Sequence, residues 1–131
     1  MILDTSAILA VLLEEPGHEE LISTLASAES IAVGAPTLAE TGVVLGSRLG
    51  GDGSFVLARF VDELQVAIVP FGDDHWREAV EAFLRFGKGR HRAALNFGDC
   101  LTYAVARLAG HPLLWVGKDF DHTDLVPARR C

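Results

Sequence analysis

The first seven residues, MILDTSA, constrain this chain more than any other segment, because they place one carboxylate at the end of an apolar run. The run is typical of a short buried strand, and Asp4 stands where that strand stops. In an open parallel α/β sheet, ligands bind outside the carboxyl ends of the strands. Asp4 could instead cap the next helix, as Thr5 or Ser6 could. Capping alone does not explain a charge here, since desolvating it costs roughly several kcal/mol unless it is paired or bound to metal. We therefore predict a functional role for Asp4.

The length and composition predict one compact domain over residues 1–131. A chain of 131 residues can bury a continuous core, and 50% hydrophobic residues exclude a disordered protein. The apolar run over residues 7–13 is too short to span a bilayer and follows an aspartate, so we expect no membrane segment and no export signal. Cys100 and Cys131 are too few for a disulfide framework and fit no zinc motif, which favours the reducing cytoplasm.

The formal net charge of −7 argues against a protein that coats nucleic acid non-specifically. It does not exclude a nuclease, because carboxylates gathered to hold cations add to the negative total. The distribution of charge along the chain is therefore more informative than its sum.

The rest of the chain alternates segments of helical period with short apolar runs, which predicts a parallel sheet with helices on both faces. The fold class is α/β. Strands are expected at residues 31–33, 66–69 and 113–116, and helices at 7–13, 21–28, 36–49, 57–64, about 74–86 and 98–108. Asp73 or Asp74 is expected to cap the fifth of these helices, which should bury Trp76, Ala79, Val80 and Phe83.

Four carboxylates stand at the ends of these predicted elements. Asp4 ends the first strand, Glu40 lies in the first turn of a helix, Asp99 starts a helix and Asp119 follows the last clear strand. Strand carboxyl ends and the following helix N-termini share one edge of a parallel sheet, so these side chains can converge.

Each member of the set has a plainer explanation. Thr37 and Glu40 have the spacing of a capping box. Asp99 could be an ordinary helix N-cap, and Asp119 could belong to an acidic loop. Taken together, their positions favour a shared site more than any one of them does alone.

Four carboxylates at one edge would repel one another, by roughly 3 kcal/mol for each pair about 5 Å apart. Only oxygen ligands are present, so Mg²⁺ or Mn²⁺ is the matching cation, and such a site suits phosphate-ester chemistry. The basic loop, defined by Lys88, Arg90, His91 and Arg92, could hold a phosphate backbone. It could also be a solvated loop at a helix end.

Four stretches of this chain resemble PIN-domain ribonucleases, and most of all VapC-type toxins. They are MILDTSA, TLAET around Glu40, NFGDCLTYAVA around Asp99 and GKDFDHTD around Asp119. The resemblance covers essentially the whole chain in the right order, and its most specific part is GKGRHRAALNFGDC.

The resemblance implies a three-layer sandwich around a parallel sheet, a Mg²⁺-dependent endoribonuclease, a homodimer, and inhibition by a VapB-type antitoxin whose tail enters the acidic groove. It implies that Asp4 and Asp99 bind metal directly, whereas Glu40 and Asp119 bind through water or position the nucleophile. Ser6, in the Asp-x-Ser motif, would support the site and, with Lys88, Arg90 and Arg92, contact RNA.

One position departs from the family pattern. Lys118 stands where the family often has Asn, which leaves Asp121 as an alternative to Asp119, although the match through Phe120 and His122 favours Asp119.

Three other kinds of protein keep carboxylates in similar positions. A receiver domain needs an aspartate at the end of its third strand, and residues 66–70 end without one. A haloacid-dehalogenase-type phosphatase needs a second aspartate at position 6, which is Ser6. The remaining alternative is a non-catalytic PIN-like domain that binds RNA or a partner.

Overall fold

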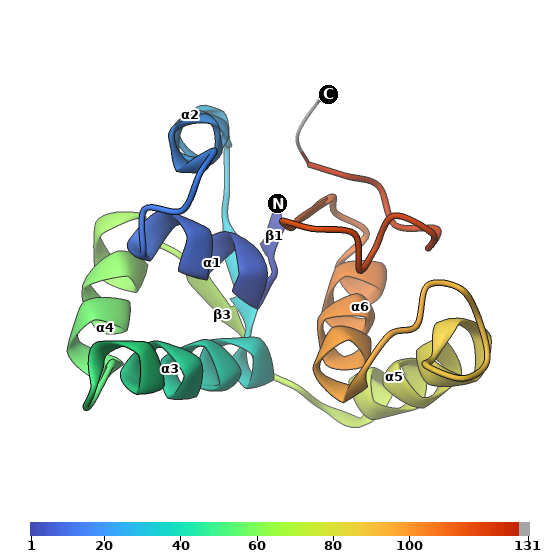
Figure 1. Ribbon diagram of the computed structural model, residues 1–131. Helices are drawn as coiled ribbons and strands as arrows, with labels where there is room; N and C mark the ends of the chain where they lie inside the picture. The colour runs from blue at the N-terminus through green and yellow to red at the C-terminus, as the bar shows by residue number, and fades with distance from the viewer. Residues whose placement is uncertain (129–131) are drawn as a thin grey trace.

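The computed structural model describes residues 1–128, so Cys131 lies outside the described residues. Within that range the chain forms a four-stranded parallel sheet with six helices (Figure 1). The elements are β1 (Ile2–Leu3), α1 (Thr5–Leu12), α2 (His18–Ser27), β2 (Ala32–Gly34), α3 (Ala35–Leu49), α4 (Ser54–Glu63), β3 (Ala67–Val69), α5 (Asp73–Phe86), α6 (Phe97–Ala109) and β4 (Leu113–Leu114).

The sheet has the order β3-β2-β1-β4, which places β1 in its interior. Ile2 is in register with Ala32 on one side and with Leu113 on the other. The backbone N–H of Asp4 donates to the carbonyl of Leu114, so the pairing continues to the residue that ends β1. Asp4 thus leaves the sheet between two paired strands, as the position of MILDTSA predicts.

Alternate residues of β1 and β4 belong to different cores, because successive side chains of a strand point to opposite faces. Ile2 and Leu113 pack in the core that α5 and α6 cover, whereas Leu3 and Leu114 pack in the core that α1 to α4 supply. In Figure 1, α5 and α6 lie on one side of β1, and α1, α2 and α4 lie on the other. The three-layer α/β/α prediction is confirmed.

Helices α1 and α3 begin immediately after β1 and β2, and α6 packs closely against the end of β2. Gly34 ends β2 where a Cβ atom would lie 2.7 Å from Cγ2 of Val105 on α6. A larger residue would push α6 away from the sheet. The N-termini of α1 and α3 therefore gather at one sheet edge, beside α6.

The predictions for α5 were partly wrong. Gly72 is its N-cap and Asp73 is already helical, so neither aspartate caps it. Its buried residues are Ala79, Ala82 and Phe86, whereas the predicted Trp76, Val80 and Phe83 are exposed. The helix carries two adjoining apolar stripes, and only the one that packs on α6 is covered. Periodicity alone does not reveal which stripe that is.

The other bounds differ by smaller amounts. Helix α1 starts at Thr5 rather than at residue 7, because Asp4 caps it, and β4 is shorter than the predicted 113–116. No helix within residues 1–128 is both long enough and apolar enough to cross a membrane.

Candidate active site

Asp4 combines a capping role with an unusual degree of burial. Its Oδ2 accepts hydrogen bonds from the backbone N–H of Ser6 at 3.1 Å and from the Ser6 hydroxyl at 2.5 Å. Only 6% of Asp4 is exposed. Burial raises the pKa of its carboxyl group; hydrogen bonds from Ser6 and Thr102 oppose this, and the charge of Glu40 adds to it. The capping alternative is therefore correct for Asp4, but it accounts for only part of its environment.

Glu40 lies in the second turn of α3, because that helix begins at Ala35. The predicted capping-box alternative is wrong: Gly34 is the N-cap, and no side chain caps the helix. Oε1 of Glu40 instead accepts a hydrogen bond from the Thr5 hydroxyl at 2.9 Å. A Cβ atom at Gly98 would lie 2.6 Å from Oε2 of Glu40. The carboxylate is thus held between α1 and the first turn of α6.

Asp99 is the third residue of α6, and Asn96, not Asp99, is the N-cap. The two form a capping box: the N–H of Asp99 donates to Oδ1 of Asn96 at 2.8 Å, and the N–H of Asn96 donates to Oδ2 of Asp99 at 3.0 Å. The pKa of Asp99 is nevertheless raised to about 6. Desolvation is the main cause, and the charges of Asp119, Asp4 and Glu40 add to it, against the hydrogen bond from Asn96.

Asp119 is exposed in the loop after β4, and the loop is held by its neighbours on both sides. Phe120 is buried against Trp115, with ring centroids 5.7 Å apart. Further along, Oδ1 of Asp124 accepts a 2.6 Å hydrogen bond from the hydroxyl of buried Tyr103. Because Phe120 is anchored next to it, Asp119 has a defined place beside the other carboxylates.

The sequence does not predict the contacts that Asp124 makes. Its Oδ2 lies 3.4 Å from Arg85 and 3.7 Å from Arg107, so it joins the C-terminal loop to α5 and α6. Hydrogen bonding from Tyr103 and the two guanidinium groups lower the pKa of Asp124 against desolvation, and the same contact helps desolvation raise the pKa of Tyr103.

The structure brings Asp4, Glu40 and Asp119 within electrostatic range of Asp99. Among residues 1–128, no three His, Cys, Asp or Glu side chains already stand together as a ligand group for a metal ion. The donor set is nonetheless oxygen-only, and its mutual repulsion is what a divalent cation would relieve. The residues therefore fit Mg²⁺ or Mn²⁺ by their chemistry.

Ser6 and the basic loop are the remaining predicted site residues. The Ser6 hydroxyl donates to Asp4 and accepts from the N–H of Val116 at 3.0 Å, so it links the ends of β1 and β4. The basic loop joins α5 to α6 (Figure 1). Lys88, Arg90 and Arg92 are exposed there, and the Arg90 guanidinium lies 5.8 Å from the centre of the Phe83 ring. Their contact with RNA stays a prediction.

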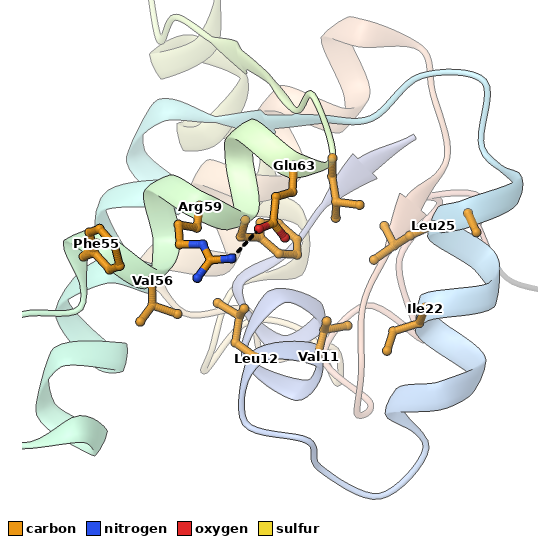
Figure 2. Close-up of a pocket in the computed structure, with 11 residues that line it drawn as sticks. Val11, Leu12, Ile22, Leu25, Phe55, Val56, Arg59 and Glu63 are labelled. Carbon is orange, nitrogen blue, oxygen red and sulfur yellow. Dashed lines mark hydrogen bonds and ion pairs between the residues drawn. The ribbon is translucent and has the colours of Figure 1, made fainter.

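Two cavities bear on the location of the active site. One of about 240 Å³ opens beside Glu40, between α3 and α6, and is lined also by Phe97 and Gly98. Another, of about 400 Å³, lies between α1, α2 and α4 (Figure 2). Apart from Arg59 and Glu63, which pair at 2.7 Å, its lining is apolar, and it contains none of the four carboxylates. Of these two cavities, only the first adjoins a carboxylate of the candidate site.

Comparisons with known proteins agree with this geometry. The PIN domain family matches residues 1–126. Ribonuclease VapC36 of Mycobacterium tuberculosis is 48% identical over 126 residues, which cover 95% of this chain and 91% of that protein. Ribonuclease VapC of Mycolicibacterium smegmatis is 40% identical and covers 96% of this chain and 98% of its own.

A solved structure shows the same fold. The crystal structure of Mycobacterium tuberculosis VapC20, a toxin that cleaves the sarcin-ricin loop, superposes with a TM-score of 0.80 over 98% of both chains at 22% identity. That likeness supports the architecture, and the closer relatives support the activity. The chain belongs to the PIN-domain family and, within it, to the VapC ribonucleases, which are the toxins of toxin–antitoxin systems.

Proposed function

We propose that this chain, as one domain over residues 1–131, is a Mg²⁺-dependent endoribonuclease that cleaves phosphodiester bonds at the four carboxylates. The observation that carries the proposal is the place of the carboxylates at one sheet edge: Asp4 is buried where β1 ends, and Glu40 lies against Thr5 of α1 and Gly98 of α6, next to Asp99. A purely structural cap would have no reason to gather such charges. Mn²⁺ should substitute for Mg²⁺, since both prefer oxygen ligands.

Each carboxylate has a separate task in this proposal. Asp4 and Asp99 would hold the cation directly, whereas Glu40 and Asp119 would bind it through water or orient the attacking nucleophile. When bound, the cation would supply charge neutralisation at the scissile phosphate and a lower pKa for the attacking water. Because Ser6 donates two hydrogen bonds to one oxygen of Asp4, the Asp4 carboxylate is already oriented before RNA binds.

Substrate binding is assigned to the basic loop, with Ser6 at the centre of the site. Lys88, Arg90 and Arg92 are exposed and can contact phosphates. We place the activity in the cytoplasm, where its RNA substrate is found.

A VapB-type antitoxin is the proposed inhibitor, through a tail that enters the acidic groove. The local excess of carboxylates favours a basic tail there. A homodimer is the proposed assembly, and the exposed apolar stripe of α5, with Trp76, Val80 and Phe83, offers a surface for it. Light scattering on the purified chain would check the assembly independently of activity.

Cleavage of a labelled RNA by the purified chain tests the proposed chemistry. Mg²⁺ or Mn²⁺ should support cleavage and EDTA should abolish it, whereas Ca²⁺ should bind but support cleavage poorly. Full cleavage in excess chelator would contradict the metal mechanism. RNA binding without cleavage in any of these cations would favour the non-catalytic alternative.

A further inference from the structure

The buried polar side chains of residues 1–128 are gathered in one place. They are Asp4, Thr5, Thr37, Thr41 and Thr102, each at most 9% exposed. A buried hydroxyl is costly unless it is hydrogen-bonded, and valine has nearly the same shape without that cost. Four threonine hydroxyls beside two site carboxylates therefore call for an explanation beyond packing.

The first set of hydroxyls ends on Glu40. The Thr5 oxygen lies 2.9 Å from Oε1 of Glu40 and 3.1 Å from the Thr41 hydroxyl. An ionised carboxylate only accepts, and each hydroxyl has a single proton. Thr5 therefore donates its proton to Glu40 rather than to the Thr37 carbonyl, which is 3.3 Å from the Thr5 hydroxyl.

The second set of hydroxyls joins α3 to α6. The hydroxyls of Thr37 and Thr102 lie 2.9 Å apart, and either could donate. Thr102 is 1% exposed and lies on α6, three residues beyond Asp99.

The two sets meet at Thr37, whose carbonyl accepts from the Thr41 hydroxyl at 2.7 Å. That bond, within one turn of α3, is an ordinary local feature of helices. The contact from Thr5 to Glu40 is different, because it joins α1 to α3 across 35 residues of chain. The contact from Thr37 to Thr102 likewise joins α3 to α6.

We propose that Thr5 is a positioning residue of the active site, which orients Glu40 through a hydroxyl donor that reaches from α1 to α3. The inference rests on the proposed function, because it takes Glu40 as a site residue. Thr5 itself does not touch substrate. It holds Oε1 of Glu40, so that the carboxylate does not rotate freely when it acts in the site.

Paired serine and alanine variants test this proposal, because both remove the threonine methyl group and differ only in the hydroxyl. Thr5→Ala should bind Mn²⁺ about 10-fold more weakly than Thr5→Ser in the absence of RNA, measured by electron paramagnetic resonance of free Mn²⁺. The turnover number for RNA should fall by a similar factor with an unchanged KM.

Thr24 provides the matched control, since its hydroxyl bonds only the Glu20 carbonyl within its own helix. Its serine and alanine variants should bind Mn²⁺ equally. In a Glu40→Gln background, the difference between Thr5→Ser and Thr5→Ala should disappear, because the hydroxyl then has no carboxylate to orient.

The outcomes distinguish a failure of the positioning role from a failure of the proposed function. Equal Mn²⁺ affinity and turnover for Thr5→Ser and Thr5→Ala would overturn the positioning role of Thr5. If Thr5→Ala fails to fold, Thr5→Val decides the proposal against the parent, because valine keeps the shape of threonine and removes only the hydroxyl. If Glu40→Gln by itself leaves both Mn²⁺ affinity and cleavage unchanged, the proposed function fails instead.

Discussion

Replacing Asp99 by Asn removes one charge from the carboxylate site at nearly constant shape. A rise in pKa from the ordinary 3.8 to about 6 disfavours the folded protein at neutral pH by roughly 3 kcal/mol. Asp99 is partly exposed, so solvent screening reduces this to about 1–2 kcal/mol. Asn keeps an acceptor for the Asn96 N–H but loses about 0.3–1 kcal/mol of interaction with the helix dipole. The net gain without metal is about 1 kcal/mol.

The size of this effect depends on pH. Because the folded pKa of Asp99 is the higher one, its protonated form favours folding below pH 3.8, and that advantage is lost as the pH rises through 6. Asp99→Asn and the parent should therefore melt at similar temperatures near pH 4 in EDTA. At pH 7.5 the variant should melt about 3 °C higher.

Added Mg²⁺ should raise the melting temperature of the parent more than that of Asp99→Asn, and the variant should not cleave RNA. Asp74→Asn is a matched control, since it removes an exposed first-turn aspartate of α5. It should melt slightly lower than the parent and keep the parent's response to Mg²⁺. An Asp99→Asn variant that is less stable than the parent in EDTA at pH 7.5, responds normally to Mg²⁺ and cleaves RNA would refute the reasoning.

Two further changes probe the surroundings of the site. Arg90→Ala with Arg92→Ala should weaken RNA binding and lower its salt slope by about 1.4, while Mn²⁺ affinity is unchanged; an unchanged slope in a binding titration would leave the basic loop a solvated surface. Tyr103→Phe keeps the buried ring but removes the donor to Asp124, so the free energy of unfolding should fall by about 1–3 kcal/mol in a urea titration. Equal stability of Tyr103→Phe and the parent would show that the two arginines alone hold Asp124.

Much of the fold follows from local pattern. The apolar run of β1, the strand–helix alternation and the breaker residues predict a parallel α/β protein, because strands and helices bury side chains with different periods. The chemistry of the site follows in the same way: an oxygen-only donor set indicates a hard divalent cation, wherever its members lie.

Other features needed the tertiary structure. The Thr-x-x-Glu spacing predicts a capping box, but α3 starts at Ala35, so Glu40 turns to Thr5 instead. The choice between the two apolar stripes of α5 depends on where α6 packs, which no local pattern encodes.

The sequence by itself determined the fold class, and it predicted the metal chemistry and the four carboxylates, because residue type and element ends are local properties. The tertiary structure decided which partner each side chain has. Thr5 and Thr102 look like ordinary helical residues in the chain, and Asp124 looks like loop acidity. The hydrogen bonds of Thr5 and Thr102 join helices that are far apart in sequence, and that of Asp124 joins a loop to α6. Such contacts exist only once the chain has folded around the sheet.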